Sequence, residues 1–268
     1  MNKFISFQLV LFCSIGFVRA QNMLGPKITA MGNNGSSVKD IWSIASNTSG
    51  ITSIEWPTLA LSYANHFFDK QLSRQAIAFV FPIKNTYLGL DFQRYGITEY
   101  NEIKTGFALA KKFGDELSIG IKVNYHQLKI SNYGQTTGFS VDVGAMYKLN
   151  KEIVLGLYLN NPSKQRYNNS TISIAIPIAL HIGATYQAAN KISVATTIRK
   201  SINSAVDVAI GIDYQIISSL SLRGGLSMKP FKQYAGVGFN FKRFTIDGAV
   251  ENDPYLGYSS QISLAYAF

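Results

Sequence analysis

Residues 117–147 alternate between apolar and polar side chains over the length of two strands, and this pattern constrains the fold more than any other feature. The apolar positions are Leu117, Ile119, Ile121, Val123 and Tyr125, then Phe139, Val141, Val143, Ala145 and Tyr147. A period of two places these side chains on one face of a sheet and the small, polar or charged ones on the other. Because the alternation recurs down the chain with little helical periodicity, it favours a closed barrel with lipid outside and a polar lumen.

Fourteen segments after residue 56 share the alternation. Their approximate centres are Leu61, Ala78, Leu90, Phe107, Ile121, Val143, Leu157, Ile182, Thr196, Ala209, Arg223, Gly236, Ile246 and Leu264. An even number of strands brings both ends of a bacterial outer-membrane barrel to one side of the membrane. The sequence therefore predicts an all-β fold, a transmembrane antiparallel up-and-down β-barrel of about 14 strands with an N-terminal hatch or short helix.

The connections between these segments alternate in length. The short ones are residues 83–85, 114–116, 150–151, 189–190, 217–219 and 242–243. The others, mostly longer, are residues 67–72, 95–100, 131–137, 161–176, 201–203, 229–232 and 252–258. Tight periplasmic turns and longer external loops are typical of outer-membrane barrels. The longest, residues 161–176, is either an external lid or binding loop or a plain solvated loop.

Residues 1–20 have the features of a secretory signal peptide. Lys3 precedes an apolar run at residues 9–18, and Val18 and Ala20 suit a cleavage site. Cys13 is the only cysteine and lies in this segment, so we expect a mature chain without thiols or disulfides. The expected organisation is a signal peptide at 1–20, an N-terminal hatch or plug at 21–56 and an outer-membrane barrel at 57–268.

The segment 21–56 differs from the rest of the chain. Ser36 or Ser37 could cap a short helix whose apolar face is made by Val38, Ile41, Trp42 and Ala45. Two interpretations are open: an arm packed on the periplasmic rim, or a plug inside the barrel with Trp42 buried. The candidate hatch residues are Met31, Gly32, Trp42 and Asn47.

The formal net charge is +10, yet the charges are scattered singly. A nucleic-acid partner would need a clustered basic face, so none is expected. The candidate lumen charges are Lys122, Asp142, Arg199, Asp207, Asp213 and Arg223, with Asp247 and Glu251 in the same phase. The register places Arg199 opposite Asp207 and Asp213 opposite Arg223 across hairpins. Paired charges in a narrow lumen are usually structural, since an unpaired charge there would be costly.

The three histidines, His66, His126 and His181, fall on separate strands. Ser140 lies near His126 by register, but a catalytic pair would need a third group to orient the imidazole. Serine and histidine are common lumen residues, and chance proximity is the preferred interpretation. No catalytic residue, metal site or cofactor is predicted, and the protein is expected not to be an enzyme.

Short motifs along the chain resemble one family of membrane proteins. They are AMGNNG at 30–35, DIWS at 40–43, NTSG at 47–50, VDVGAMY at 141–147, IPI at 176–178, IGATY at 182–186, LRGG at 222–225 and the end from Leu256 to Phe268. In this order they resemble the PorV/PorQ proteins of Bacteroidota, which are related to FadL-type transporters. At 47–50 the family usually has Asn-Pro-Ala-Gly.

The resemblance implies an outer-membrane barrel with a hatch, acting in or beside type IX protein secretion. The alternative is a FadL-like channel for hydrophobic small molecules. The expected partners are outer-membrane lipid and lipopolysaccharide, the barrel assembly machinery that would recognise the terminal Phe268, and a secretion-system component or a hydrophobic ligand.

Overall fold

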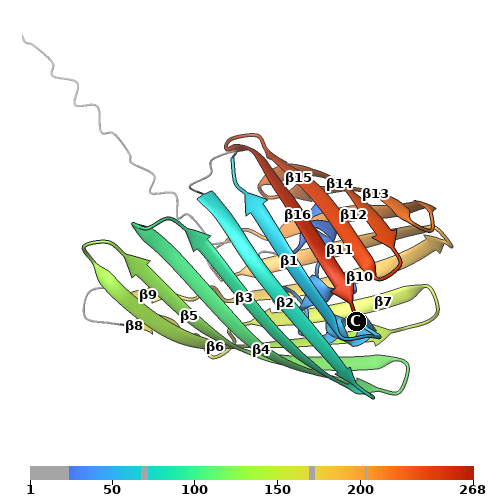
Figure 1. Ribbon diagram of the computed structural model, residues 1–268, viewed down its shortest axis with the longest axis horizontal. Helices are drawn as coiled ribbons and strands as arrows, with labels where there is room; N and C mark the ends of the chain where they lie inside the picture. Colours follow the sequence, from blue (N-terminus) through green and yellow to red (C-terminus); the bar gives the residue numbers. More distant parts are fainter. Residues whose placement is uncertain (1–23, 68–71, 169–172, 203) are drawn as a thin grey trace, which may run out of the picture.

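The computed structural model describes residues 24–67, 72–168, 173–202 and 204–268. The predicted signal peptide lies outside these residues. Fourteen strands form one closed antiparallel barrel (Figure 1). The strands are β1 (Thr58–Asn65), β2 (Ser73–Ile83), β3 (Thr86–Gly96), β4 (Tyr100–Phe113), β5 (Leu117–Ile130), β6 (Gly134–Lys148), β7 (Ile153–Asn160), β10 (Ala179–Ala189), β11 (Ile192–Ser201), β12 (Asp207–Ile217), β13 (Leu220–Met228), β14 (Phe231–Phe241), β15 (Phe244–Asp253) and β16 (Gly257–Ala267). The short strands β8 (Arg166–Asn168) and β9 (Ser173–Ala175) pair separately.

The first and last strands close the barrel. Leu61 of β1 faces Leu264 of β16, and the amide of Phe268 donates to the carbonyl of Pro57 over 2.8 Å. Both ends of the barrel sequence therefore lie beside the short turns, at the end marked C in Figure 1. We call this the turn end and the opposite one the loop end. Each of the fourteen predicted strands is present, and the predicted fold class is confirmed.

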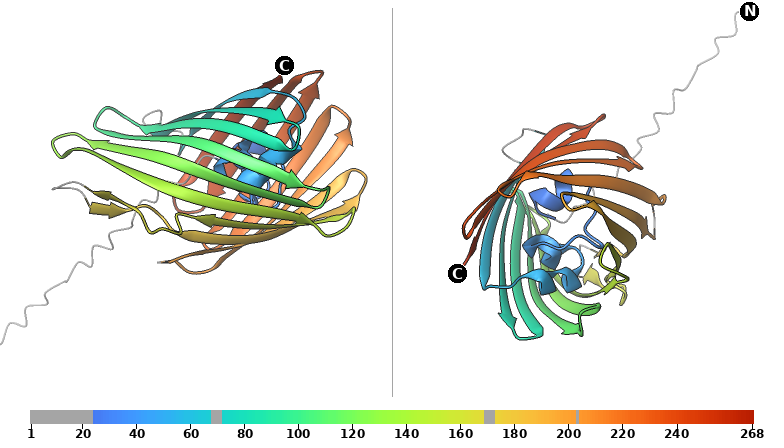
Figure 2. Two further views of the ribbon diagram at one scale, coloured as in Figure 1. Left: turned by 90° about the horizontal axis from the view of Figure 1, so that it is seen from below. Right: turned by 90° about the vertical axis from the view of Figure 1, so that its right-hand side faces the viewer.

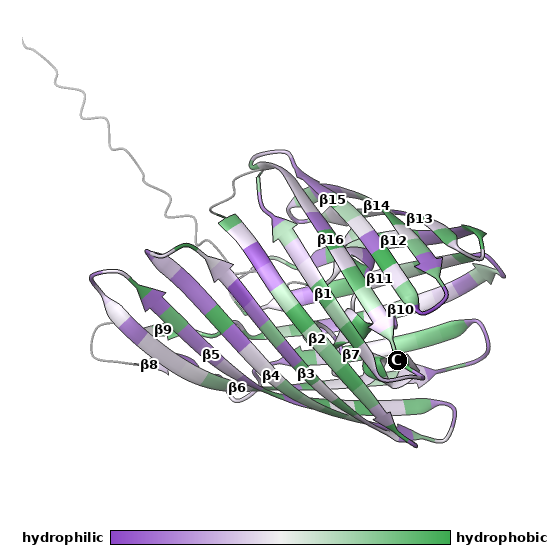
Figure 3. Ribbon diagram, in the orientation of Figure 1, coloured by the Kyte–Doolittle hydropathy of each residue, from purple (hydrophilic) through white to green (hydrophobic). Residues whose placement is uncertain are grey.

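The outer surface is apolar and the inner surface is small or polar. On β5, Ile119, Ile121 and Val123 are exposed, whereas Lys122 and Asn124 are fully buried. Apolar and polar positions alternate in the same way along the other strands (Figure 3). An apolar outer belt around a polar lumen is the arrangement that suits a lipid bilayer. In the described part of the chain, no helix has the length and apolarity needed to cross a membrane.

The barrel wall is tallest at β4, β5 and β6, which have 14, 14 and 15 residues, compared with 8 in β7. The loop predicted at 131–137 is shorter than expected, because β5 runs to Ile130 and β6 begins at Gly134. Tyr125 and Phe139 pack together on the outer surface of this wall, with ring centroids 5.4 Å apart. Above this pair the outer face turns polar and the inward Leu128 is buried. Pairing between the strands therefore continues beyond the apolar belt.

The N-terminal arm, residues 24–56, lies inside the barrel (Figure 2). It contains helix α1 (Pro26–Ala30) and two 3₁₀ helices, η1 (Ile41–Ala45) and η2 (Thr48–Ser53). The predicted cap at Ser36 or Ser37 is wrong. The carboxylate of Asp40 accepts from the amide of Trp42 over 2.8 Å, and Asp40 forms a reciprocal capping box with Ser43. Asn47, one of the candidate hatch residues, caps η2.

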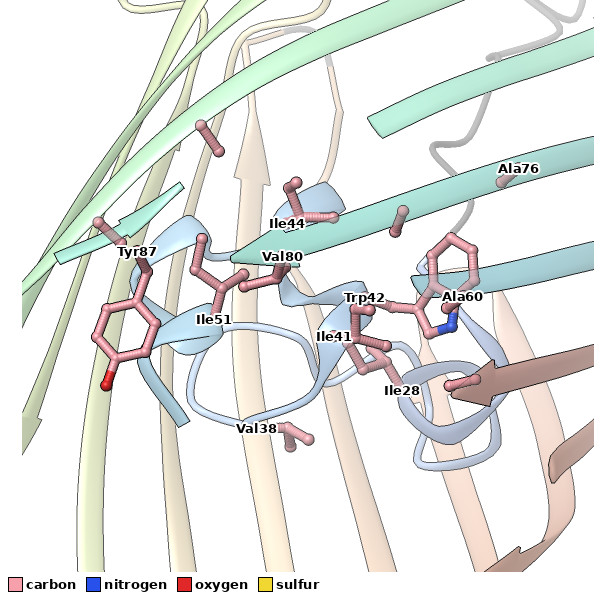
Figure 4. Close-up of a cluster of buried hydrophobic side chains, with 14 of the residues drawn as sticks. Ile28, Val38, Ile41, Trp42, Ile44, Ile51, Ala60, Ala76, Val80 and Tyr87 are labelled. Atoms are coloured by element: carbon pink, nitrogen blue, oxygen red, sulfur yellow. The ribbon is translucent and has the colours of Figure 1, made fainter. Parts of the chain in front are cut away.

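The apolar core lies between the arm and one side of the barrel wall. Trp42 is 1% exposed and packs in a cluster with Ile28, Ile41, Ile44 and Ile51 (Figure 4). The wall contributes mainly small side chains to this cluster, namely Ala60, Ala64, Ala76, Ala78, Ala108, Ala110, Ala195 and Ala265. The small lumen residues thus make room for the arm, and the buried apolar surface stabilises it in place.

Candidate functional site

A cavity of about 530 Å³ occupies the lumen between the arm and the loop end. Its floor includes Ser36 and Ser46 of the arm, and its upper part reaches Lys229 and Pro230 of the loop between β13 and β14. The walls carry charged and polar groups, among them Lys104, Asp142, Tyr158, Arg199 and Asp207. This volume falls within the usual range for small-molecule sites.

Glycines of the wall fix where the arm lies. A Cβ atom added at Gly156 would stand 1.9 Å from the carbonyl oxygen of Ser36, and one at Gly211 would stand 2.2 Å from that of Met31. Arm backbone also lies 2.6 and 2.3 Å from a Cβ added at Gly120 and Gly225, and arm side chains lie 2.1 and 2.5 Å from one at Gly144 and Gly236. Only glycine lets the arm come so near the wall at these positions. The arm therefore occupies a shape built into β5, β6, β7 and β12–β14.

Hydrogen bonds hold the arm to the same wall. The side-chain amide of Asn47 donates to the carbonyls of Ala145 on β6 and Leu157 on β7, over 3.0 and 3.1 Å. The hydroxyls of Ser37 and Thr185 lie 2.8 Å apart. Of the candidate hatch residues, Met31 and Trp42 lie in the apolar core, and Gly32 takes a φ of +78° against β12 and β13. Their role as a hatch stays a prediction.

Lys122 has a partner that the sequence did not indicate. Its ammonium lies 2.8 Å from the carboxylate of Asp91 and donates to the carbonyl of Ile44 in the arm, also over 2.8 Å. Asp91 is on β3 and Lys122 on β5, so the pair spans β4 at Gly106. A Cβ atom at Gly106 would stand 2.2 Å from that carboxylate. The alternation around Leu90 and Phe92 places Asp91 in the lumen phase, which is the signal that could have found it.

Asp142 accepts hydrogen bonds from three neutral donors. It accepts from the amide of Asn124 over 2.8 Å, from the hydroxyl of Tyr158 over 3.0 Å and from the backbone of Asn161 over 3.1 Å. Hydrogen bonds to the charged form stabilise a buried carboxylate.

The side-chain amide of Asn161 donates to the carbonyls of Gln165 and Ile176, and so joins the two ends of the longest loop, residues 161–176. For this loop the sequence left a lid or binding loop and a plain solvated loop both open. Of its described residues, Arg166 and the buried Ile176 lie against the inner face of β6 at Gly138.

Arg199 and Asp207 pair as the register predicts and join the arm to a loop. The guanidinium lies 2.6 Å from the Asp207 carboxylate and donates to the carbonyl of Asn33 in the arm over 3.1 Å. The same carboxylate accepts from the amides of Met228 and Lys229. A continuous set of hydrogen bonds therefore connects the floor of the cavity to its mouth.

Asp213 and Arg223 are direct cross-strand neighbours, as predicted, with the nearest atoms 3.2 Å apart. Arg223 also contacts Asp247 on β15, reaching across β14 at Gly238, where an added Cβ would stand 2.4 Å from the guanidinium. Arg223 therefore forms ion pairs with two carboxylates, those of Asp213 and Asp247. Glu251, the last charge in the predicted lumen phase, pairs with Lys232.

The histidines do not form one cluster. His66 follows β1, and burial together with the positive charges of Arg74 and Lys232 lowers its pKa to about 4. His181 packs edge-on against Tyr158. His126 lies 2.8 Å from the hydroxyl of Ser140, yet no carboxylate contacts its ring among the described residues. The third group that a catalytic pair requires is not found there.

Further up the cavity, Tyr167 of β8 packs edge-on against His126. Burial raises the pKa of its phenol, and the charge of Glu102 raises it further, so the hydroxyl stays neutral. Within the described ranges, no group of three or more His, Cys, Asp or Glu could hold a metal ion.

The sequence comparisons give no relative for this chain. No family model matches it, and no curated protein matches it either.

The structure, in contrast, is similar to known outer-membrane channels. CymD, a monoaromatic hydrocarbon channel, superposes with a TM-score of 0.71 at 12% identity, over 91% of this chain and 97% of that one. The toluene transporter TbuX of Ralstonia pickettii gives 0.69 at 14%, over 91% and 98%. A FadL homologue of Pseudomonas aeruginosa gives 0.67 at 12%, over 91% and 98%. At this identity the likeness shows the fold, a FadL-type barrel spanning the length of these channels.

Proposed function

We propose that this protein is an outer-membrane channel for small molecules, of the FadL-like kind, in which the arm closes the lumen and moves to let the solute pass. The main support is the arrangement of the lumen, in which a cavity of about 530 Å³ extends to the loops and the arm forms its floor. The apolar outer belt supports a location in the outer membrane. The similar channels support transport over the secretion hypothesis.

Removal of residues 24–53 is expected to raise the conductance of the barrel in planar bilayers. The arm lies against wall glycines such as Gly144, Gly156 and Gly211, so its removal empties the space beside them. Barrel diameter grows with strand number, so fourteen strands enclose a wider lumen than the eight-stranded barrels whose side chains fill the interior. The full-length protein is the control, and heat-shifted mobility in detergent verifies that both variants fold. Equal conductance from two folded barrels would contradict a closing role for the arm.

The type IX secretion hypothesis rests on the sequence resemblance to PorV/PorQ proteins. It predicts that deletion of the gene stops export of secreted cargo while small-molecule uptake is unchanged. The channel hypothesis predicts the opposite pair of results. One deletion strain, assayed for both, therefore separates the two.

A further inference from the structure

We propose that the hairpin tip between β13 and β14, residues 228–231, controls the arm, so that displacing this tip releases the arm from its closed position. This inference rests on the proposed channel function and names the regulation of the same site. It follows from two separate chains of hydrogen bonds that begin at the tip and meet at Asn33 of the arm.

The first chain passes through two charged side chains. One carboxylate oxygen of Asp207, Oδ1, accepts from the amides of Met228 and Lys229, over 3.2 and 2.9 Å. The other, Oδ2, accepts from the guanidinium of Arg199 over 2.6 Å. The same guanidinium donates to the carbonyl of Asn33 over 3.1 Å. The two oxygens of Asp207 therefore connect the tip to the arginine that contacts the arm.

The second chain passes through two buried hydroxyls. The side-chain amide of Asn33 donates to the hydroxyl of Tyr234 over 3.3 Å. That hydroxyl lies 3.3 Å from the hydroxyl of Ser227, which donates to the carbonyl of Pro230 over 3.1 Å. Asn33, Ser227 and Tyr234 are each less than a tenth exposed. Breaking this chain would leave buried polar groups without partners, which is costly.

The tip can be reached from the loop end. Met228 and Phe231 are exposed, whereas Lys229 and Pro230 border the cavity. A solute that enters the cavity from the loop end therefore contacts the tip before it reaches the floor made by the arm.

Asn33 makes the two chains act on the same point of the arm. Its carbonyl belongs to the first chain and its side-chain amide to the second. A displaced tip would disturb both, since Asp207 and Ser227 would lose their partners together. Other bonds between arm and wall, such as those of Asn47, lead to residues within β6 and β7. The tip is thus coupled to the arm through Asn33.

The test inserts two glycines between Lys229 and Pro230 of the full-length protein. The insertion removes no side chain but frees the tip from Asp207 and Ser227, and exposed loop tips usually tolerate insertions. Single barrels are recorded in planar bilayers with moderate urea, which loosens the least stable parts first. The ratio of open to closed time is expected to rise roughly fivefold or more, as the loss of one or more hydrogen bonds would produce.

The matched control is the same insertion between Tyr255 and Leu256, at the exposed tip between β15 and β16. The amides of these two residues donate to Asp253 within that loop. This insertion should leave the opening unchanged. The rate at which a protease cleaves the arm is measured on the same variants, and heat-shifted mobility in detergent verifies that each barrel folds.

The chains themselves are tested with Arg199→Gln/Tyr234→Phe, which interrupts both. This variant is expected to open about as readily as the tip insertion, and the insertion should add little in its background. The variant Asn33→Gly interrupts the second chain from the arm side and keeps the carbonyl. The φ of +60° at Asn33 suits glycine, so this change preserves the backbone.

Equal opening of the two insertion variants would overturn the inference and leave the channel proposal standing. Additive effects of the tip insertion and of Arg199→Gln/Tyr234→Phe would overturn it as well, because the tip would then act by another route. Faster cleavage of the arm in the tip insertion without any conductance would support the coupling between tip and arm and contradict the channel proposal.

Discussion

Replacing Arg223 with glutamine is expected to lower the free energy of unfolding by about 3–5 kcal/mol, the range for breaking a buried ion pair from one side. Arg223 is 8% exposed and contacts both Asp213 and Asp247, so the variant leaves two carboxylates without their cation. Unfolding in urea from lipid vesicles measures the change. The matched control is Arg243→Gln, at an exposed turn, with a change of less than about 0.5 kcal/mol expected.

The pairing itself is tested by a double-mutant cycle with Asp213→Asn. We expect Asp213→Asn to cost less than Arg223→Gln, because Asp247 still compensates the guanidinium. In the Arg223→Gln background, Asp213→Asn should cost little or even stabilise, since it removes an uncompensated charge. Additive losses would contradict the contact between Asp213 and Arg223.

Replacing Gly156 with valine is expected to displace the arm and open the barrel in planar bilayers. The new Cβ would stand 1.9 Å from the carbonyl oxygen of Ser36, which is backbone and cannot rotate away. Valine is a good strand residue, so β7 itself should form. We expect higher conductance and faster protease cleavage of the arm than in the parent protein.

The matched control is Gly248→Val on β15. The nearest atom to its new Cβ is in the side chain of Val237 at 3.8 Å, which is an ordinary contact. This variant should keep the low conductance of the parent. If Gly156→Val and Gly248→Val conduct alike and both barrels fold, the close contact between arm and wall does not control the lumen.

The barrel could be predicted from the sequence because its determinants are local. A period of two fixes which face each residue occupies, and a slip of one residue would turn Arg223 or Asp213 toward the outer surface. The hairpin partners Arg199 and Asp207 follow from the same register. The second partner of Arg223 could not be predicted this way. Asp247 lies one strand further away, and the contact depends on the missing side chain of Gly238.

The sequence left the location of the arm open between the periplasmic rim and the lumen, and its conformation could not be predicted. Its apolar residues and the small lumen residues indicate a plug, but its 3₁₀ helices are shaped by distant contacts. Asn47, for example, is positioned by the carbonyls of Ala145 and Leu157, about a hundred residues away in sequence. The cavity lining has the same origin: Ser36 and Ser46 meet Lys104 and Arg199 only after the barrel closes around the arm.

The most direct test of the central claim, that the arm closes the lumen, is a reversible disulfide between arm and wall. Ser37 and Thr185 suit this test because their hydroxyl oxygens lie 2.8 Å apart, close enough for two cysteines to bond. The only natural cysteine, Cys13, lies in the predicted signal peptide, so the introduced pair should be the only thiols. The variant Ser37→Cys/Thr185→Cys is placed in planar bilayers, and moderate urea is added to unfold the arm ahead of the barrel.

With the disulfide reduced, urea is expected to raise the conductance as the arm leaves the lumen. With the disulfide formed, the conductance should stay low at the same urea concentration and rise when a reductant is added. The single variant Ser37→Cys should open under both conditions. If the oxidised double variant, with its thiols shown to be bonded, opened at the same urea concentration as the reduced one, the arm would not be what closes the lumen.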